Sequence, residues 1–113
     1  MPAGVRLRQA HQLREFDLLL NQHFRTKKTV RAYANRLSLT PNYLNALCRL
    51  HRNQTVIALI QQRVLVQAQR LLASSELLVK QIAAELGFVH VSYFSRFFRR
   101  HTGQTPEQFR LNR

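Results

Sequence analysis

The sequence has few of the residues on which extracellular proteins, metalloproteins and enzymes depend. Its 113 residues include one cysteine, Cys48, so an internal disulfide is excluded and a reducing compartment is expected. The three glycines form no phosphate-binding loop and the five acidic residues form no paired-carboxylate pattern, so we expect neither an enzyme nor a cofactor. No apolar run approaches the roughly 18 residues of a membrane span, and the N-terminus lacks the apolar run of a secretion signal. These absences predict a soluble, cytoplasmic protein without membrane contact.

Positive charge is what the chain has in excess. Lysine and arginine number 18 against five acidic residues, which gives a formal net charge of +13. Such a surface favours polyanionic partners. Fifteen of the basic residues are arginine, whose planar guanidinium suits phosphates and guanine edges better than a lysine ammonium does. The composition therefore indicates a nucleic-acid-binding protein, the alternative being that the basic residues only solvate the surface.

The chain contains an internal repeat. The segment LNALCRLHRNQTV, which begins at Leu44, reappears fifty residues later as FSRFFRRHTGQTP from Phe94. Upstream, VRAYANRLSL from Val30 aligns with VKQIAAELGF from Val79 at an offset of forty-nine. The second copy has gained one residue between the two blocks, which is tolerated where a turn joins two helices. Each copy therefore predicts a helix, a turn and a second helix.

Apolar spacing and capping residues predict an all-α fold with about seven helices. Thr40 before Pro41, and Thr105 before Pro106, are start signals, because threonine accepts from a free backbone N–H and proline has none to leave unpaired. Gly87 is expected at the turn of the second copy. The helices are expected at about 9–24, 30–36, 41–52, 55–74, 78–86 and 91–101, with a short one after residue 105.

Three segments are expected along the chain. Residues 1–54 form a first helix-turn-helix subdomain with an N-terminal helix, 55–74 a long linker helix, and 75–113 a second helix-turn-helix subdomain. The linker contains neither proline nor glycine, and its apolar residues keep a helical period: Ile57, Ile60, Val64, Ala68 and Leu71. The remaining apolar residues are expected to broaden its buried surface: Val56, Leu59, Leu65 and Leu72. At about 1.5 Å per residue it spans roughly 28 Å, which is of the order of one DNA turn, about 34 Å. One chain can then contact two segments of the major groove without dimerising.

In a helix-turn-helix the second helix lies in the major groove. In the first copy Asn42, Asn45 and Arg49 recur on one outward face, together with Ala46. Because Ala46 offers only a methyl contact, Asn42 and Asn45 are the expected polar base readers. Thr40 and the first backbone amides of the helix are expected to contact phosphate.

The second copy turns Ser92, Ser95, Arg96 and Arg99 outward. Arg96 lies early in its helix and is expected to donate two parallel hydrogen bonds to guanine O6 and N7. Arg49, Arg52, Arg99 and Arg100 lie farther along the two helices and are expected to contact phosphates. His90 either contacts DNA or is an exposed histidine at a helix start. Cys48 and His51 have ligand-compatible spacing, but no second pair completes a metal site, so we expect none.

The run IAAELGFVHVSYFSRFFRRHTGQTPEQFR resembles the signature of the AraC/XylS family of bacterial transcription regulators. TPNYLNAL and RVLVQAQRLL resemble the same family, so the resemblance extends from Val30 to Arg110. It implies two helix-turn-helix units joined by a long helix and bound to double-stranded promoter DNA. It also implies the base-reading positions: Asn42, Asn45, Ala46 and Arg49 in the first unit, and Val91, Ser92, Ser95 and Arg96 in the second.

Four residues depart from the family pattern. Ala46 removes a long side chain often found at that position, which weakens the expected sequence readout by the first unit. His90 stands where many members have an acidic residue, so the usual cap of the second groove helix is expected to be missing. Cys48 stands where an aromatic residue is common and Asn53 replaces the usual glycine, which suggests a looser first unit. Many members carry an N-terminal domain that binds an effector and dimerises, and nothing in this chain corresponds to it. The chain is either a short stand-alone regulator or, as we expect, a DNA-binding fragment whose dimerisation, if any, depends on that domain.

Two other classes of protein remain as alternatives. One is a non-specific architectural or RNA-binding protein that binds through charge alone. The other is a protein-interaction module whose outward helix faces contact a partner such as RNA polymerase, and this role can coexist with DNA binding. In each case we expect a bacterial cytoplasmic location at the nucleoid.

Overall fold

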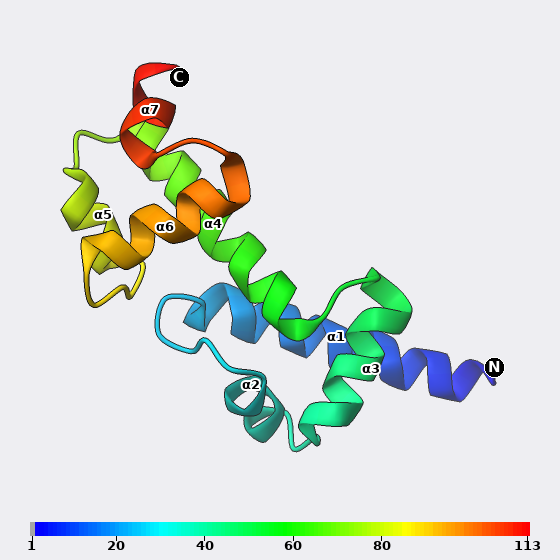
Figure 1. The fold of residues 1–113 in the computed structure, drawn as a ribbon. Helices are drawn as coiled ribbons and strands as arrows, with labels where there is room; N and C mark the ends of the chain where they lie inside the picture. The colour runs from blue at the N-terminus through cyan, green and yellow to red at the C-terminus, as the bar shows by residue number, and fades with distance from the viewer. Residues whose placement is uncertain (1) are drawn as a thin grey trace. The chain divides into compact units, whose positions relative to one another are not determined.

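The computed structural model describes residues 2–113, which form seven helices and no strand in that range (Figure 1). The predicted all-α fold is confirmed. The helices are α1 (Ala3–His23), α2 (Val30–Arg36), α3 (Pro41–Arg52), α4 (Val56–Ser74), α5 (Val79–Glu85), α6 (Val91–Thr102) and α7 (Pro106–Leu111).

The chain groups into two compact units, 1–63 and 64–113, which divide within α4. Among the described residues, no helix is long and apolar enough to cross a membrane. The predicted boundaries at 54 and 74 remain a prediction.

The core of the first unit forms where α1, α2 and α3 pack against one another. α1 contributes a buried stripe, Leu13, Phe16, Leu20 and Phe24, at the spacing expected from the sequence. Phe16 meets Tyr33 of α2 edge to face, with ring centroids 5.6 Å apart. The Tyr33 hydroxyl donates to the Lys27 carbonyl oxygen at 2.9 Å, which holds the loop between α1 and α2. Burial raises the pKa of Tyr33 to about 12.

α1 begins at Ala3, six residues before the predicted start. Pro2 precedes its first turn, where no side chain caps the helix. Side chains of α1 instead bond to α3 farther along. The bonded pairs are Gln9 with His51 (2.8 Å), Gln12 with Tyr43 (2.9 Å) and Asp17 with Arg52 (2.7 Å). From Gln9 onward α1 is therefore tied to α3 by side-chain hydrogen bonds between residues distant in sequence, which the apolar periodicity of α1 does not reveal.

The second unit is organised around the buried phenylalanines of α6, Phe94 and Phe98. Phe109 of α7 packs edge to face on Phe98, with ring centroids 5.4 Å apart. Arg110 donates to the carbonyl oxygens of Leu72 at 3.0 Å and Leu77 at 2.6 Å. These bonds satisfy carbonyls that the end of α4 and the following loop leave unpaired, and they hold α7 beside them (Figure 1).

The turns of the two copies have matching backbone conformations but different residues. Gly87 and Gly103 have positive φ angles of 85° and 79°. The matching positions in the first copy are Ser38 and Asn53, with φ angles of 57° and 55°. A residue with a Cβ atom costs roughly 1–2 kcal/mol in this conformation, and less when it is asparagine. The first copy therefore carries a backbone cost that glycine removes in the second.

The buried row of α4 differs from the predicted one at both ends. The row is Val56, Ile60, Val64, Ala68 and Leu72, at four-residue steps. The prediction started it at Ile57 and ended it at Leu71. Ile57 is in fact 38 % exposed, so that choice was wrong. Both rows are apolar, and spacing alone cannot separate them.

Candidate nucleic-acid interface

The outward face of α3 contains three exposed residues, Asn42, Ala46 and Arg49. They project away from Leu44 and Cys48, which are fully buried. The Thr40 hydroxyl accepts a hydrogen bond from the backbone N–H of Tyr43 at 3.1 Å, so Thr40 caps the helix as the sequence predicts. This cap and Pro41 fix where α3 begins, and therefore which residues occupy its first outward turn.

Asn45 is held partly inside the protein. It is half-buried, and its Oδ1 accepts a hydrogen bond from the backbone N–H of Val56 at 3.0 Å. Val56 is the first residue of α4 and its N–H has no partner within that helix. Ser95 and Pro106 occupy the matching positions in the second copy, and proline has no N–H. Only the first copy therefore needs a side-chain acceptor at this position. Because Asn45 uses only its Oδ1 in this bond, its amide N–H groups remain available for other contacts.

Arg52 differs from Arg49 in having a carboxylate partner. Its guanidinium donates two hydrogen bonds to Asp17 of α1, at 3.1 and 2.7 Å. This hydrogen bonding raises the pKa of Arg52 above its usual range. Arg49 is exposed and forms no ion pair within residues 2–113. The two arginines looked alike in the sequence because Asp17 is thirty-five residues away from Arg52.

Cys48 is buried in the core of the first unit. Burial raises the pKa of its thiol to about 11, so the thiol is protonated at neutral pH. His51, which lies at ligand spacing from Cys48, is hydrogen-bonded to Gln9. Over residues 2–113 no group of three or more His, Cys, Asp or Glu side chains could hold a metal ion.

The outward face of α6 contains three exposed polar residues, Ser92, Arg96 and Arg99, while Ser95 is half-buried. Val91 is exposed at the first turn. His90 occupies the N-cap position and makes no side-chain hydrogen bond there, which confirms the expectation drawn from the family pattern. The first amides of α6 therefore lack the side-chain acceptor that Thr40 provides to α3.

Tyr93 is a residue of this face that the sequence reasoning missed. Cζ of Arg96 lies over its ring, 5.2 Å from the centroid. The His90 ring contacts Tyr93 from the other direction along the helix, with centroids 5.3 Å apart. The three residues follow each other at three-residue steps, a spacing that brings helical side chains together and that was available as a signal.

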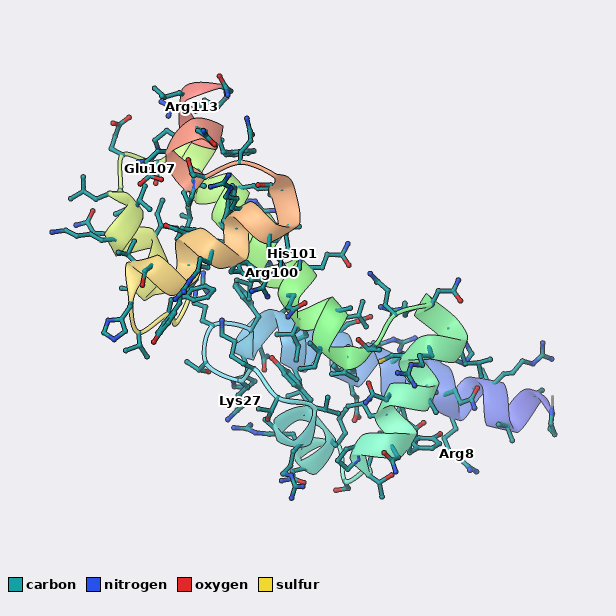
Figure 2. The ribbon with its side chains drawn as sticks, in the orientation of Figure 1. Arg8, Lys27, Arg100, His101, Glu107 and Arg113 are labelled. Atoms are coloured by element: carbon teal, nitrogen blue, oxygen red, sulfur yellow. The ribbon has the colours of Figure 1, made fainter. Side chains whose placement is uncertain are left out.

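Further basic side chains lie outside the outward faces of α3 and α6. Figure 2 shows Arg8 on the first turns of α1 and Lys27 in the loop after it. It also shows Arg100 and His101 near the end of α6. Arg96 and Arg99 form no ion pair within residues 2–113. The arginines on the outward face of α6 thus keep their charge uncompensated by the residues that the structure describes.

Sequence comparison finds two kinds of match. A family model described as a helix-turn-helix domain matches residues 33–112. The HTH-type transcriptional activator RhaR of Cronobacter sakazakii is 42 % identical over 67 residues, which are 59 % of this chain and 24 % of that protein. The arabinose operon regulatory protein of Salmonella typhimurium is 29 % identical over 109 residues, 96 % of this chain and 37 % of that protein. The chain thus spans a quarter to somewhat over a third of the length of these relatives.

Solved structures with the same fold include domains of two regulatory proteins. The C-terminal domain of AraT, a response regulator from Geobacillus stearothermophilus, has a TM-score of 0.85 and 28 % identity, covering 90 % of this chain and 85 % of that one. The DNA-binding domain of AdpA, a transcriptional factor solved in complex with a target DNA, has a TM-score of 0.77 and 23 % identity. That match covers 92 % of this chain and 90 % of the AdpA chain.

Proposed function

Because the chain belongs to the AraC family of helix-turn-helix, sequence-specific DNA-binding transcription regulators, we propose that α3 and α6 are its two readers of the major groove. The family is one of regulators and not of enzymes. The observation that carries the proposal is the exposed Arg96 on the outward face of α6, which forms no ion pair within residues 2–113. An arginine in that position can donate to guanine O6 and N7, which is a common sequence-specific contact in the major groove.

The two readers contribute unequally. In α6, Arg96 reads guanine, Ser92 and Ser95 supply hydroxyls, and Val91 offers an apolar contact at the first turn. Arg99 contacts phosphate, and His90 contacts DNA at the uncapped start of the helix. In α3 the readers are Asn42, Ala46 through its methyl group, and the amide N–H groups of Asn45, with Arg49 and Thr40 on phosphate. The first reader therefore has fewer bidentate options, because the Asn45 oxygen is engaged by Val56.

Residues 55–74 serve in this proposal as the linker between a first subdomain, 1–54, and a second, 75–113. The support is that α4 runs without a break from Val56 to Ser74 and contributes residues to both compact units. A linker of this kind lets one chain engage two segments of the major groove. A footprinting experiment tests this, and protection of two successive groove segments is the expected result.

Substitution of Arg96 by alanine tests the function. Duplexes are first selected from a randomised library with the wild-type chain, and dissociation constants are then compared for wild type and variant on every single-base change. We expect Arg96→Ala to lose about 1–3 kcal/mol, concentrated at one guanine. Arg99→Ala is the control, and should weaken all duplexes alike and reduce the salt slope by about 1. An equal loss on all sequences for Arg96→Ala would contradict the assignment.

A non-specific architectural or RNA-binding role is separated from this function by a salt titration. Selected duplex, random duplex and single strand are compared, since every charge-driven complex weakens with salt but only a sequence reader keeps a preference for the selected duplex. The AdpA domain, which has the same fold and was solved in complex with a target DNA, supports DNA as the partner.

Contact with RNA polymerase, and hence a location at the nucleoid, is part of the proposal. Its support is that one relative is a transcriptional activator, and activators act on the transcription machinery. Binding of purified polymerase to the chain, with and without competing duplex, tests it; no binding in either condition would refute it.

A further inference from the structure

Among the described residues Arg96 has an aromatic neighbour and no carboxylate partner. Its Cζ lies 5.2 Å from the centroid of the Tyr93 ring, and no acidic side chain pairs with it within residues 2–113. We propose that Tyr93 is a positioning residue that determines specificity, by holding the Arg96 guanidinium ready for a guanine. The inference rests on the proposed function of Arg96 as a base reader.

A comparison of a carboxylate with an aromatic ring explains why a ring is suited to positioning an arginine for a base. A carboxylate orders an arginine by accepting from its N–H groups, as Asp17 does when it takes two hydrogen bonds from Arg52. An arginine held in that way has fewer donors left for a base. An aromatic ring instead attracts the guanidinium cation over the face of the ring. The N–H donors of the guanidinium lie in its own plane and point outward from the edges of that plane. Tyr93 can therefore restrict Arg96 without consuming the donors that guanine needs.

Tyr93 is itself supported from the start of the helix. The His90 ring lies 5.3 Å from the Tyr93 ring, with the two planes at 60°. His90 makes no capping bond, so its side chain is available for this contact. Tyr93 is 51 % exposed, and its hydroxyl has no hydrogen-bond partner among the described residues. The Tyr93 ring is thus packed against His90 while Arg96 lies over its face.

The first copy of the repeat shows the same tyrosine in a different role. Tyr43 matches Tyr93, but Ala46 stands where Arg96 stands, so no cation is there to be held. The Tyr43 hydroxyl donates to Gln12 of α1 at 2.9 Å. The tyrosine of the first copy joins two helices, whereas that of the second faces outward beside the reader. Tyr43 therefore provides a matched control within the same chain.

The experiment is a double-mutant cycle on the whole 113-residue chain. Dissociation constants are measured at one salt concentration for wild type, Tyr93→Phe, Tyr93→Leu, Arg96→Ala and the double variant Tyr93→Leu with Arg96→Ala. The probes are a duplex selected from a randomised library and the same duplex with 7-deazaguanine, which lacks N7, at the guanine sensitive to Arg96→Ala. Circular dichroism melting checks that each variant is folded.

Tyr93→Phe keeps the ring and should bind like wild type. Tyr93→Leu should weaken binding to the selected duplex by about two- to five-fold, the range of an exposed cation–π contact. It should have a smaller effect on the 7-deazaguanine duplex and no further effect once Arg96 is alanine. Tyr43→Leu should leave discrimination at that guanine unchanged.

Two results would overturn the inference. Additive losses for Tyr93→Leu and Arg96→Ala would show that the tyrosine acts independently of the arginine. A loss in Tyr93→Phe as large as that in Tyr93→Leu would assign the effect to the hydroxyl, as in a phosphate contact. Failure of the proposed function looks different, because Arg96→Ala alone would then weaken all duplexes alike.

Discussion

Replacing Asn45 by alanine should lower the free energy of unfolding by about 1–2 kcal/mol, the range for loss of a side-chain acceptor at a helix start. In the folded protein its Oδ1 accepts from the Val56 N–H at 3.0 Å. Val56 is 0 % exposed, so water cannot readily replace the lost acceptor. The cost is therefore expected in the upper part of that range, as for a buried donor left unpaired.

The second copy supplies the control for this prediction. Ser95 matches Asn45, and the helix start beside it is Pro106, which has no N–H to satisfy. Ser95→Ala should change the free energy of unfolding by less than about 0.5 kcal/mol. The starts of α4 and α7 are capped alike: the Thr55 hydroxyl accepts from the Ala58 N–H and the Thr105 hydroxyl from the Gln108 N–H, both at 3.1 Å. The two helix starts therefore differ mainly in the residue after the threonine.

Urea unfolding followed by far-ultraviolet circular dichroism measures the effect, because the chain has no tryptophan for fluorescence. Val56→Pro gives the first copy the solution used by the second, so Asn45→Ala should cost little in that background. The reasoning fails if Ser95→Ala costs as much as Asn45→Ala, or if the cost of Asn45→Ala persists beside Val56→Pro.

Three further predictions follow from the structure. Arg49→Ala should reduce the salt slope of DNA binding by about 1, whereas Arg52→Ala should change it by less, because Asp17 already binds Arg52; equal slopes would contradict this. Gly103→Ala should cost about 1–2 kcal/mol in urea unfolding through its φ of 79° alone, since an added Cβ meets nothing within 4 Å, and Asn53→Gly should cost nothing or stabilise. Burial raises the pKa of Cys48 from near 9 to about 11, so the folded state holds the thiol proton more tightly and its contribution to stability is complete below pH 9. That contribution is lost as the pH rises from 9 to 11, so Cys48→Ala should show a shallower fall in stability over that interval than wild type.

The helices and most of their cores could be predicted because their signals are local. Thr40 before Pro41 and Thr105 before Pro106 mark helix starts within a few residues, and the structure places helices there. The apolar stripe that ends at Phe24 depends only on helical spacing. In α4 the apolar residues are too many for spacing to separate: Val56 and Ile57 were both expected to be buried, and only Val56 is.

The candidate site was less predictable because its details depend on residues distant in sequence. Arg52 and Arg49 have the same local pattern, and only the fold brings Asp17 to one of them. The bonds from α1 to His51 and Tyr43 of α3 likewise join residues far apart in the sequence. The pairing of Tyr93 with Arg96 is consistent with their three-residue spacing, but an exposed tyrosine gives no local sign of its partner as a charged or amide side chain does.

The unequal helix starts have a consequence for how the protein can evolve. In the second copy Pro106 removes the need for an acceptor at Ser95, so that position can exchange its side chain without a penalty in folding. In the first copy the residue at position 45 must accept from the Val56 N–H, and this requirement of folding is independent of any contact with a base. We therefore expect a lineage that acquires new target sites to vary the second reader more freely than the first.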